Sequence, residues 1–409
     1  MSHTRRDFLK AGLGASALLS LGPVAPRILA ASRAGNRDTV LVVLQLSGGN
    51  DGLNTVVPYT DDAYARNRKT LRLPTADLHK IDEHVAFHPR MEPFLRLYRE
   101  GHLSILHGVG HPKPDQSHDR AMRIWHTADP ERPERQTGWL GRAADHAWKP
   151  SAVETTAVFV GPIVRPFALN AAHATVPRIR TAQDLIMRTM PGENAGQHAL
   201  ADRAATSPDS DLLALLRQAT QTAHAQSKQI EAVIEANAGS RGYPSSGLAR
   251  DLRTAAHLIR ADIGIRVIFV EIGGGGIGGF DNHANQLGNH CALLGQLAEA
   301  VSAFVGDLQR DKLLDRVLLM TFSEFGRTVK ENGRRGTGHG AAAPVFLVGG
   351  KVKGGRVGPH PSLTDLDNGG LKFHTDFRQV YATVLDRWLG FDSYAVLGSR
   401  FQSLNVLKT

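Results

Sequence analysis

Residues 40–52 read VLVVLQLSGGNDG, and this stretch decides the fold. Residues 40–46 are apolar at every position except Gln45 and are rich in valine, as expected of a strand that is buried on both faces. The glycines and the Asn50-Asp51 pair that follow are typical of a tight turn. Strands of this kind occur mainly in parallel sheets that helices cover on both sides, so the stretch predicts an α/β fold.

Similar apolar runs recur along the chain and alternate with segments of helical periodicity. The further strands that we expect are residues 103–109, 156–160, 265–270, 316–320 and 344–348. Apolar residues at helical spacing mark residues 91–99, 285–309 and 376–389. This alternation predicts a three-layer sandwich with a mostly parallel central sheet. In such sheets, ligands bind beyond the carboxyl ends of the strands.

One segment breaks the alternation. Between about Gln183 and Tyr243 the sequence contains no convincing strand, and a helix is expected over residues 246–262. We therefore expect one domain over residues 38–409, with residues 183–262 as a mainly helical insertion. Its first part forms either a subdomain or lid, or an additional cover on the sheet, and the sequence leaves both possibilities open.

The N-terminus has the layout of an export signal. Residues 4–10 read TRRDFLK, which resembles the twin-arginine consensus, and an apolar run over residues 11–21 precedes a small-residue stretch at 30–32. An amphipathic first helix is the alternative, but residues 11–31 lack a charged face until Arg27. We expect residues 1–31 to be a cleavable signal that the twin-arginine translocase reads, which places the mature protein in the periplasm or outside the cell. No later segment is long enough to predict a transmembrane span.

Composition narrows the range of partners. Hydrophobic residues make up 42% of the chain and charged residues 21%, which is typical of a globular protein. The net charge is +9, of which the expected signal carries +3 (three arginines and one lysine against one aspartate), leaving +6. This modest excess suits an anionic small-molecule ester or envelope polymer, and its lack of clustering argues against nucleic acid. Cys291 is the single cysteine, which excludes an internal disulfide, and we expect it to be buried on a helix.

Polar side chains suited to metal binding follow the expected strands. They are Asn50 and Asp51 after the first strand, Ser117 and His118 after the second, Asp281 and His283 after residues 265–270, Glu324 and Arg327 after residues 316–320, and His339 before residues 344–348. In a parallel sheet most of these groups converge on one edge. Carboxylates and imidazoles together suit Zn, Mn or Mg.

Each of these residues also has a purely structural explanation. Asp51 can close an Asx turn or cap a helix, and Glu324 can pair with Arg327 three residues further on. The pair Asp281 and His283 is more suggestive, because residues two apart in an extended segment point to the same side. Their joint placement at strand ends favours a site. The glycines of residues 273–279 resemble a dinucleotide-binding turn, but the sequence after them does not begin the helix that such a site requires. The chain also contains no G-x-S-x-G, Walker A or H-E-x-x-H motif.

The chain resembles one bacterial family, domain of unknown function 1501, whose members are typically exported by the twin-arginine route. The matching motifs are residues 45–55, 117–125, 138–142, 280–286 and 323–327, and the resemblance extends to residue 381. The family is similar to the alkaline phosphatase and sulfatase superfamily. That superfamily hydrolyses phosphate or sulfate esters at divalent metals, so the resemblance implies an alkaline-phosphatase-like sandwich.

The resemblance also implies roles for individual residues. Ser117 is the implied nucleophile, and Asn50, His118 and Arg327 are the residues implied to lie at the substrate. The implied metal ligands are Asp51, Asp281, His283, Glu324 and His339. Phe325 stands where the superfamily usually has a metal-binding histidine. The site could therefore bind two ions, as in the superfamily, or bind only one ion, or have lost its activity.

Three functions are compatible with this reading. The first is an exported metal-dependent hydrolase of phosphate or sulfate esters, with Ser117 attacking phosphorus or sulfur. The second is a non-catalytic envelope protein that keeps the fold for binding or assembly, which the phenylalanine at position 325 favours. The third is a transferase or phosphomutase, because the same superfamily contains both.

Overall fold

The structure is a computed structural model that describes residues 39–147, 156–185 except 163 and 175, 228, 231–236, 242–274 and 279–408. The expected signal and residues 186–227 of the expected insertion lie outside these residues.

The central sheet begins from the apolar run at residues 40–46, which forms β1 (Val40–Leu46). Its strands are ordered β11-β5-β10-β9-β1-β8-β6-β7, and β14 also pairs with β5. The bounds of the other strands are β5 Leu103–Gly110, β6 Ala157–Val160, β7 Arg178–Ile179, β8 Val267–Ile272, β9 Val317–Phe322, β10 Ala343–Gly349, β11 Gly355–Val357 and β14 Thr375–Asp376. The predicted α/β fold with a mostly parallel sheet is confirmed.

Strand β10 departs from that prediction. It pairs antiparallel with both β9 and β5, whereas the other pairs among the described strands of this sheet are parallel. The amino end of β10 therefore lies at the same edge as the carboxyl ends of β1, β5, β8 and β9. This reversal brings His339, which precedes β10, to the edge where the other candidate residues follow their strands.

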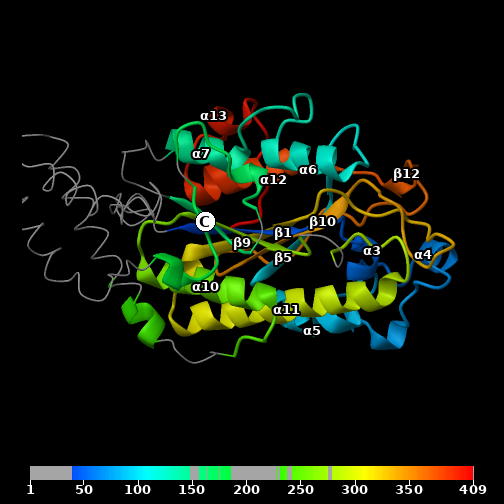
Figure 1. Ribbon diagram of the computed structural model, residues 1–409. Helices are drawn as coiled ribbons and strands as arrows, with labels where there is room; N and C mark the ends of the chain where they lie inside the picture. Colours follow the sequence, from blue (N-terminus) through cyan, green and yellow to red (C-terminus); the bar gives the residue numbers. More distant parts are fainter. Residues whose placement is uncertain are drawn as a thin grey trace, which may run out of the picture.

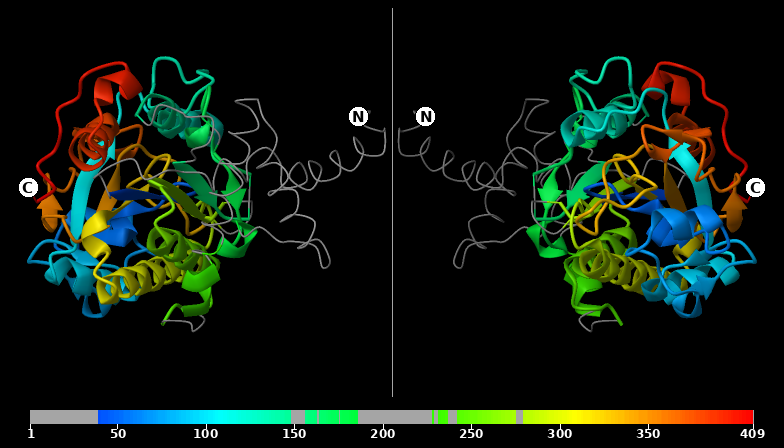
Figure 2. Two further views of the ribbon diagram at one scale, coloured as in Figure 1. Left: turned by 90° about the vertical axis from the view of Figure 1, so that its left-hand side faces the viewer. Right: turned by 90° about the vertical axis from the view of Figure 1, so that its right-hand side faces the viewer.

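Helices cover both faces of the sheet, as Figure 1 shows. The lower layer contains α5 (Glu92–Arg99), α10 (Gly247–Ala261) and α11 (Gln286–Arg310). The upper layer contains α6 (His118–Thr127), α7 (Trp139–Ala147), α12 (Phe377–Thr383) and α13 (Ser393–Leu397). The end-on views in Figure 2 show the twisted sheet between these layers, which makes the predicted three-layer sandwich.

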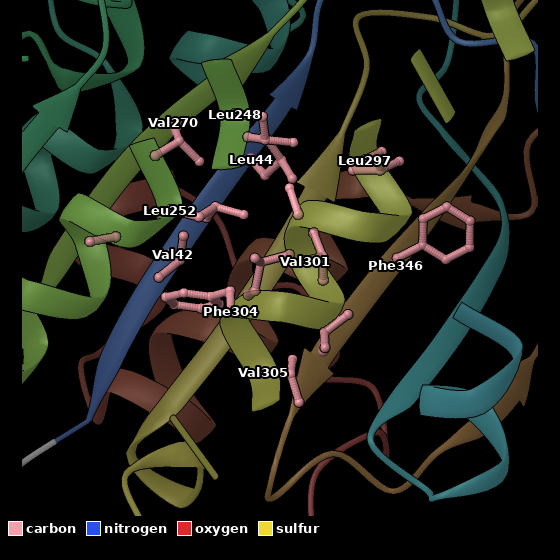
Figure 3. Packing of buried hydrophobic residues seen from close by; sticks show 14 of the residues in the cluster. Val42, Leu44, Leu248, Leu252, Val270, Leu297, Val301, Phe304, Val305 and Phe346 are labelled. Atoms are coloured by element: carbon pink, nitrogen blue, oxygen red, sulfur yellow. The ribbon is translucent and has the colours of Figure 1, made fainter. Parts of the chain in front are cut away.

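Successive residues of β1 supply the two cores alternately. Val42 and Leu44 join the lower core with residues of α10 and α11, whereas Leu41 and Val43 join the upper core. Figure 3 shows the lower core, where Leu252 of α10 and Val301 of α11 pack beneath the sheet. Burying a Leu or Val side chain contributes about 1.5–3 kcal/mol, so these faces hold the helices in place.

Helix α11 corresponds to the expected helix at residues 285–309 and is the longest in the lower layer. Among the described helices it is the one long and apolar enough to cross a membrane, and 61% of its apolar window is buried inside the molecule. Leu287, in the first turn of this helix, is 39% exposed. Cys291 is half-buried on this helix rather than fully buried as expected.

Helix α10 confirms the helix expected at residues 246–262. It packs on α11 and on the sheet, and its apolar face belongs to the lower core. The expected helix at 376–389 is also present, in two parts. Asp376 and Gln379 form a capping box at the start of α12, and a π-helix at Val384–Leu389 continues it.

Shorter elements surround the edge where the candidate residues gather. A small sheet of order β2-β4-β3 and a two-stranded sheet of β12 and β13 lie outside the main sheet. The bounds are β2 Val56–Val57, β3 His79–Lys80, β4 Ala86–Phe87, β12 Leu366–Asp367, β13 Gly370–Leu371, α3 Gly52–Thr55 and α4 Asp62–Asn67.

Candidate metal centre

Three candidate side chains meet at the edge of the sheet. His118 begins α6, Asp281 lies in the loop after β8, and His339 lies before β10. One donor atom from each side chain lies within 4.8 Å of the other two. Two imidazoles and a carboxylate at this separation are a donor set that Zn, Mn or Fe ions accept.

Two further predicted residues adjoin this trio. His283 Nε2 lies 3.0 Å from Asp281 Oδ1 and 2.9 Å from His339 Nε2. Glu324 is buried, and its Oε1 lies 2.9 Å from His118 Nδ1. We call His118, Asp281, His283, Glu324 and His339 the edge cluster. All five were predicted from sequence, and the structure brings all five together.

Hydrogen bonds determine which ring nitrogen of His339 and of His118 remains free to bind an ion. His339 Nδ1 lies 2.6 Å from the carbonyl oxygen of Gln116, so this nitrogen carries a proton and donates it. His118 Nδ1 in the same way donates to the carboxylate of Glu324. The Nε2 atoms of both rings therefore face the interior of the cluster. Carboxylates and carbonyls that orient metal-binding histidines in this manner are a recurrent feature of metal sites.

This arrangement assigns Glu324 a different task from the predicted one. Its Oε1 accepts from His118 Nδ1 and from the backbone N–H of Gly48 at 2.9 Å, and the hydroxyl of Ser323 lies 3.3 Å from Oε2. The carboxylate thus holds His118 from behind. The hydrogen bond to Glu324 raises the pKa of His118, and the negative charge of Glu324 adds to this effect.

One nitrogen of the edge cluster is left available to an ion. Within the described part of the chain, His118 Nε2 is buried and has no hydrogen-bond partner, although Asp281 Oδ1 lies 3.4 Å away. Leaving a buried polar atom unpaired costs free energy. An ion shared by His118, Asp281 and His339 would satisfy it, so the residues present fit a divalent metal. The side chain of Asp281 is 42% exposed, which gives solvent access to the cluster.

Arg327 does not face a substrate, contrary to the prediction. Its guanidinium is 1% exposed. It donates to the carbonyl oxygens of Gly48, Gly49, Thr337 and Phe280 and, at 2.7 Å, to Asp281 Oδ1. Burial alone would raise the pKa of Asp281, but the hydrogen bond and charge of Arg327 outweigh it and hold this pKa at about 2. Arg327 therefore holds the carboxylate of Asp281 in place and ionised.

Asp51 lies outside the cluster, in a buried network that the sequence did not predict. Both of its carboxylate oxygens pair with Arg68, at 2.5 and 2.9 Å, and the side-chain amide of Gln286 also donates to it. Since Arg68 occupies the carboxylate, the structure does not support the predicted role of Asp51 as a metal ligand. Burial opposes ionisation here too, but Arg68 holds the pKa of Asp51 at about 2.

Asn50 belongs to the same buried network and is 1% exposed. Its Oδ1 lies 3.0 Å from His290 Nε2 and accepts from Thr55 Oγ1 at 3.1 Å. These contacts place Asn50 beneath the turn after β1. We expected Asn50 to contact a substrate, but the structure does not bring it to the solvent-facing side of the edge cluster.

Ser117 is exposed at the start of α6, directly before His118. Its backbone N–H donates to Asp115 Oδ1 at 2.7 Å. Gln116, on its other side, accepts from His339. Both neighbours of Ser117 in the chain are therefore tied to the edge cluster, so the backbone of Ser117 lies beside it.

Phe325 forms an apolar wall of the cluster. Its ring stacks on His339 with 4.5 Å between ring centroids and lies 4.9 Å from the ring of His118. It offers no donor atom, so the described residues supply one compact donor set here and not two.

Glu271 is a residue near the site that sequence reasoning missed. It is the one charged residue of the otherwise apolar strand β8, directly before its last residue, and accepts a hydrogen bond from the Ser47 hydroxyl. Burial raises its pKa, and the charge of nearby Glu324 adds to the shift. A lone acidic residue near the end of an apolar strand was the available signal. Arg68, by contrast, had no local signal, because its partner lies 17 residues earlier in an unrelated turn.

Comparison with known sequences identifies the family. The model of a family described as "Protein of unknown function (DUF1501)" matches residues 38–396, and the chain belongs to this family. The resemblance stated from the motifs is thereby confirmed. No curated protein matches the sequence.

Several solved structures share features of the backbone at low identity. The zinc complex of the C-terminal periplasmic domain of EptC from Escherichia coli is 11% identical, with a TM-score of 0.37 over 78% of this chain and 74% of that one. An alkaline phosphatase superfamily protein from Vibrio parahaemolyticus is 11% identical, with a TM-score of 0.36 over 94% and 79%. Lipooligosaccharide phosphoethanolamine transferase A from Neisseria meningitidis is 11% identical, with a TM-score of 0.34 over 85% and 55%. Likeness at this level does not bear on the activity of the present chain.

Proposed function

Taking membership of this family as the premise, we propose that the protein is an exported, metal-dependent hydrolase of phosphate or sulfate esters. The observation that carries the proposal is the convergence of His118, Asp281 and His339, whose donor atoms lie within 4.8 Å of one another at the edge of the sheet. Clefts at the carboxyl ends of parallel strands are where α/β proteins bind their ligands.

The residues that would hold the ion are His118, Asp281 and His339, with His283 beside them. Arg327 keeps Asp281 ionised and Glu324 keeps His118 oriented, so these two act behind the ligands. A divalent ion in such a site activates a bound oxygen nucleophile and neutralises charge that develops on an ester.

Ser117 is the proposed nucleophile. Its hydroxyl oxygen would attack phosphorus or sulfur and displace the alcohol of the ester, and water would then release the phosphate or sulfate from the serine. The exposed position of Ser117 next to His118 supports this role. In this proposal His118 binds the ion and not the substrate, because its Nδ1 donates to Glu324 and its Nε2 faces the cluster.

Export completes the proposal. The sequence TRRDFLK at residues 4–10 supports passage through the twin-arginine translocase, which carries folded proteins and so allows an ion to be bound before export. Replacing Arg5 and Arg6 together by lysine should leave the protein inside the cytoplasm. Unchanged export of that variant, measured by cell fractionation, would argue against this route.

The first experiment measures the metal content of the mature chain from about Ser32, purified without a metal-affinity tag. We expect the edge cluster to hold about one equivalent, after reloading with Zn, Mn or Mg in turn if necessary, and the Asp281→Ala/His283→Ala variant to bind about one equivalent less than the parent. Asp119→Ala is the matched control, because this exposed carboxylate lies next to His118 and outside the cluster. Absence of any bound ion after reloading would overturn the proposal.

The second experiment tests turnover. Phosphate and sulfate esters should be hydrolysed by the loaded protein, and Ser117→Ala should reduce kcat by at least about 100-fold without releasing the ion. Unchanged turnover in Ser117→Ala would remove the nucleophile from the proposal.

A non-catalytic binding protein is the second candidate, and two observations favour it. Phe325 fills one side of the cluster with a ring that cannot bind metal, and Arg68 occupies Asp51. Bound metal together with absence of turnover on both ester classes would favour this candidate over the hydrolase.

A further inference from the structure

A second pair of histidines lies away from the edge cluster, around a small cavity beside β5. His107 of β5 and His360, in the loop after β11, line this cavity together with Gly52, Val56 and Pro361. Its volume is about 10 Å³. That is roughly the room that one water molecule or one ion needs.

His107 brings an unpaired nitrogen to this cavity. The residue is 2% exposed. Within the described residues, its Nε2 is buried and has no hydrogen-bond partner. Burial, followed by the neighbouring His360, lowers the pKa of His107 to about 3, so the ring is neutral near pH 7. A neutral imidazole is the form that binds metals.

His360 has a ring nitrogen with a free lone pair. Its Nδ1 lies 2.9 Å from the carbonyl oxygen of Pro361 and donates to it, which leaves Nε2 without a proton in the neutral ring. The centroids of the His107 and His360 rings are 5.4 Å apart. With metal–nitrogen bonds of about 2.0–2.1 Å, two imidazoles that bind one ion at a tetrahedral angle have centroids roughly 5–5.5 Å apart.

The surrounding charges tolerate a cation. Arg356 is the nearby positive group, and Asp82 pairs with it at 2.8 Å. Asp61 lies with His360 along an open depression on the outer side. His374 is close but its nitrogens are engaged, Nδ1 with Thr375 Oγ1 and Nε2 with the carbonyl oxygen of Pro359, each at 3.0 Å.

We propose that His107 and His360 form a second metal site, which holds one transition-metal ion that favours imidazole ligands, Zn²⁺ or Cu⁺. The centroid separation of 5.4 Å fits two imidazoles at a tetrahedral angle, so either ion would complete its coordination with water ligands from the outer depression. His360 lines both the cavity and the depression, so it lies on the entry path. The site is separate from the edge cluster and does not depend on the proposed hydrolase activity.

Crystals of the mature chain, soaked separately with Zn²⁺ and with Cu⁺ under ascorbate, test the proposal directly. We expect an anomalous difference peak at the absorption edge of the soaked metal between His107 Nε2 and His360 Nε2. The metal that gives the peak decides between the two ions. A water molecule without anomalous signal in both soaks would overturn the proposal.

Solution binding provides the matched comparison. His360→Gln should lose about one equivalent of the bound ion relative to the parent chain, as measured by competition with a chromophoric chelator. His374→Gln should lose none, because that ring lies beside the cavity and its nitrogens have other partners. Equal loss in both variants, or in neither, would contradict the assignment. Circular dichroism of each variant checks that the fold is intact.

Discussion

At the scale of single residues, the partner of a side chain decides its role at this site. Glu324 and Asp281 are both carboxylates at the edge cluster, yet one is buried behind His118 and the other is open to solvent. Glu324 accepts from Gly48 and His118, so its lone pairs are directed away from the ion position. Asp281 Oδ1 accepts from Arg327 and also faces His118, His283 and His339, while the side chain of Asp281 stays 42% exposed.

The first prediction concerns the link between Glu324 and His118. The hydrogen bond and the charge of Glu324 both raise the pKa of His118, so Glu324→Gln should lower this pKa towards 6.5. Titration of the His118 ring by NMR in metal-free protein measures the shift. Asp119→Asn removes a neighbouring exposed charge and should leave the His118 pKa nearly unchanged. A His118 pKa that is equal in parent and Glu324→Gln would contradict the assigned contact.

The second prediction concerns the buried pair of Asp51 and Arg68. Arg68 also donates to the carbonyl oxygens of Thr328 and Val329, so it ties the turn after β1 to the segment between Glu324 and His339. Arg68→Met leaves a buried carboxylate unpaired and should lower the free energy of unfolding by about 3–5 kcal/mol. Asp51→Asn/Arg68→Met should recover part of that loss in urea unfolding. A double variant less stable than both single variants would contradict the pairing.

The third prediction is the acid dependence of stability. Folding holds the pKa of Asp51 at about 2, below its ordinary value of 3.8. A lowered pKa contributes stability that is fully present above pH 3.8 and is lost as the pH falls towards 2. Asp51→Asn/Arg68→Met should therefore show a shallower fall in unfolding free energy between these pH values than the parent. Parallel curves for the two proteins would indicate that Asp51 is not the source.

At the scale of elements, the turn after β1 sets the distance between the sheet and the edge cluster. Gly48 has a φ of +111°, and a Cβ there would lie 2.5 Å from the backbone nitrogen of Asp281. Only a residue without Cβ allows the two loops to approach this closely. The glycines that predicted a turn in the sequence are thus also what places Asp281.

The fourth prediction follows from that close approach. Gly48→Ala should destabilise the protein by about 1–3 kcal/mol and weaken metal binding, because Asp281 must move. Gly306→Ala is the control and should change stability in the opposite direction, because a Cβ added at this position of α11 would meet no atom within 4 Å. It should stabilise the helix by up to about 1 kcal/mol. Thermal unfolding and metal titration of both variants measure the two effects, and tighter metal binding by Gly48→Ala would contradict the argument.

The sequence predicted those elements whose signal is local. The apolar run of β1 and the one-sided apolar pattern of α11 depend on neighbouring residues, and both appear within a residue or two of their expected bounds. The antiparallel direction of β10 was not predictable in this way, because its apolar run fits either direction. The partners of Asp51 and Arg327 were missed for the same reason. Arg68 and the turn carbonyls reach them only through folding of distant segments.

At the scale of the whole molecule, the edge cluster joins segments that are far apart in the chain. The bond from His339 to the carbonyl of Gln116 spans 223 residues, and the contact between His118 and Glu324 spans 206. These segments follow β5, β8 and β9 or precede β10, so they meet only when the sheet is complete. An ion at the cluster therefore binds the folded chain and not the unfolded one.

The fifth prediction is that metal stabilises the whole fold. A ligand that binds only the folded state adds RT ln(1 + [L]/Kd), or about 2.7 kcal/mol at a concentration 100 times Kd. Thermal unfolding of the loaded mature chain should shift to lower temperature after chelation and recover on adding the ion back. Asp281→Ala/His283→Ala should show a clearly smaller shift than the parent, because Asp281 contacts His283, His339 and His118 and its loss separates the donors. The shift in the loaded parent should also shrink as the pH falls, since His118 must lose a proton to bind an ion and its raised pKa makes protons stronger competitors. A chelator effect of equal size in the parent and the double variant would place the stabilising ion elsewhere in the molecule.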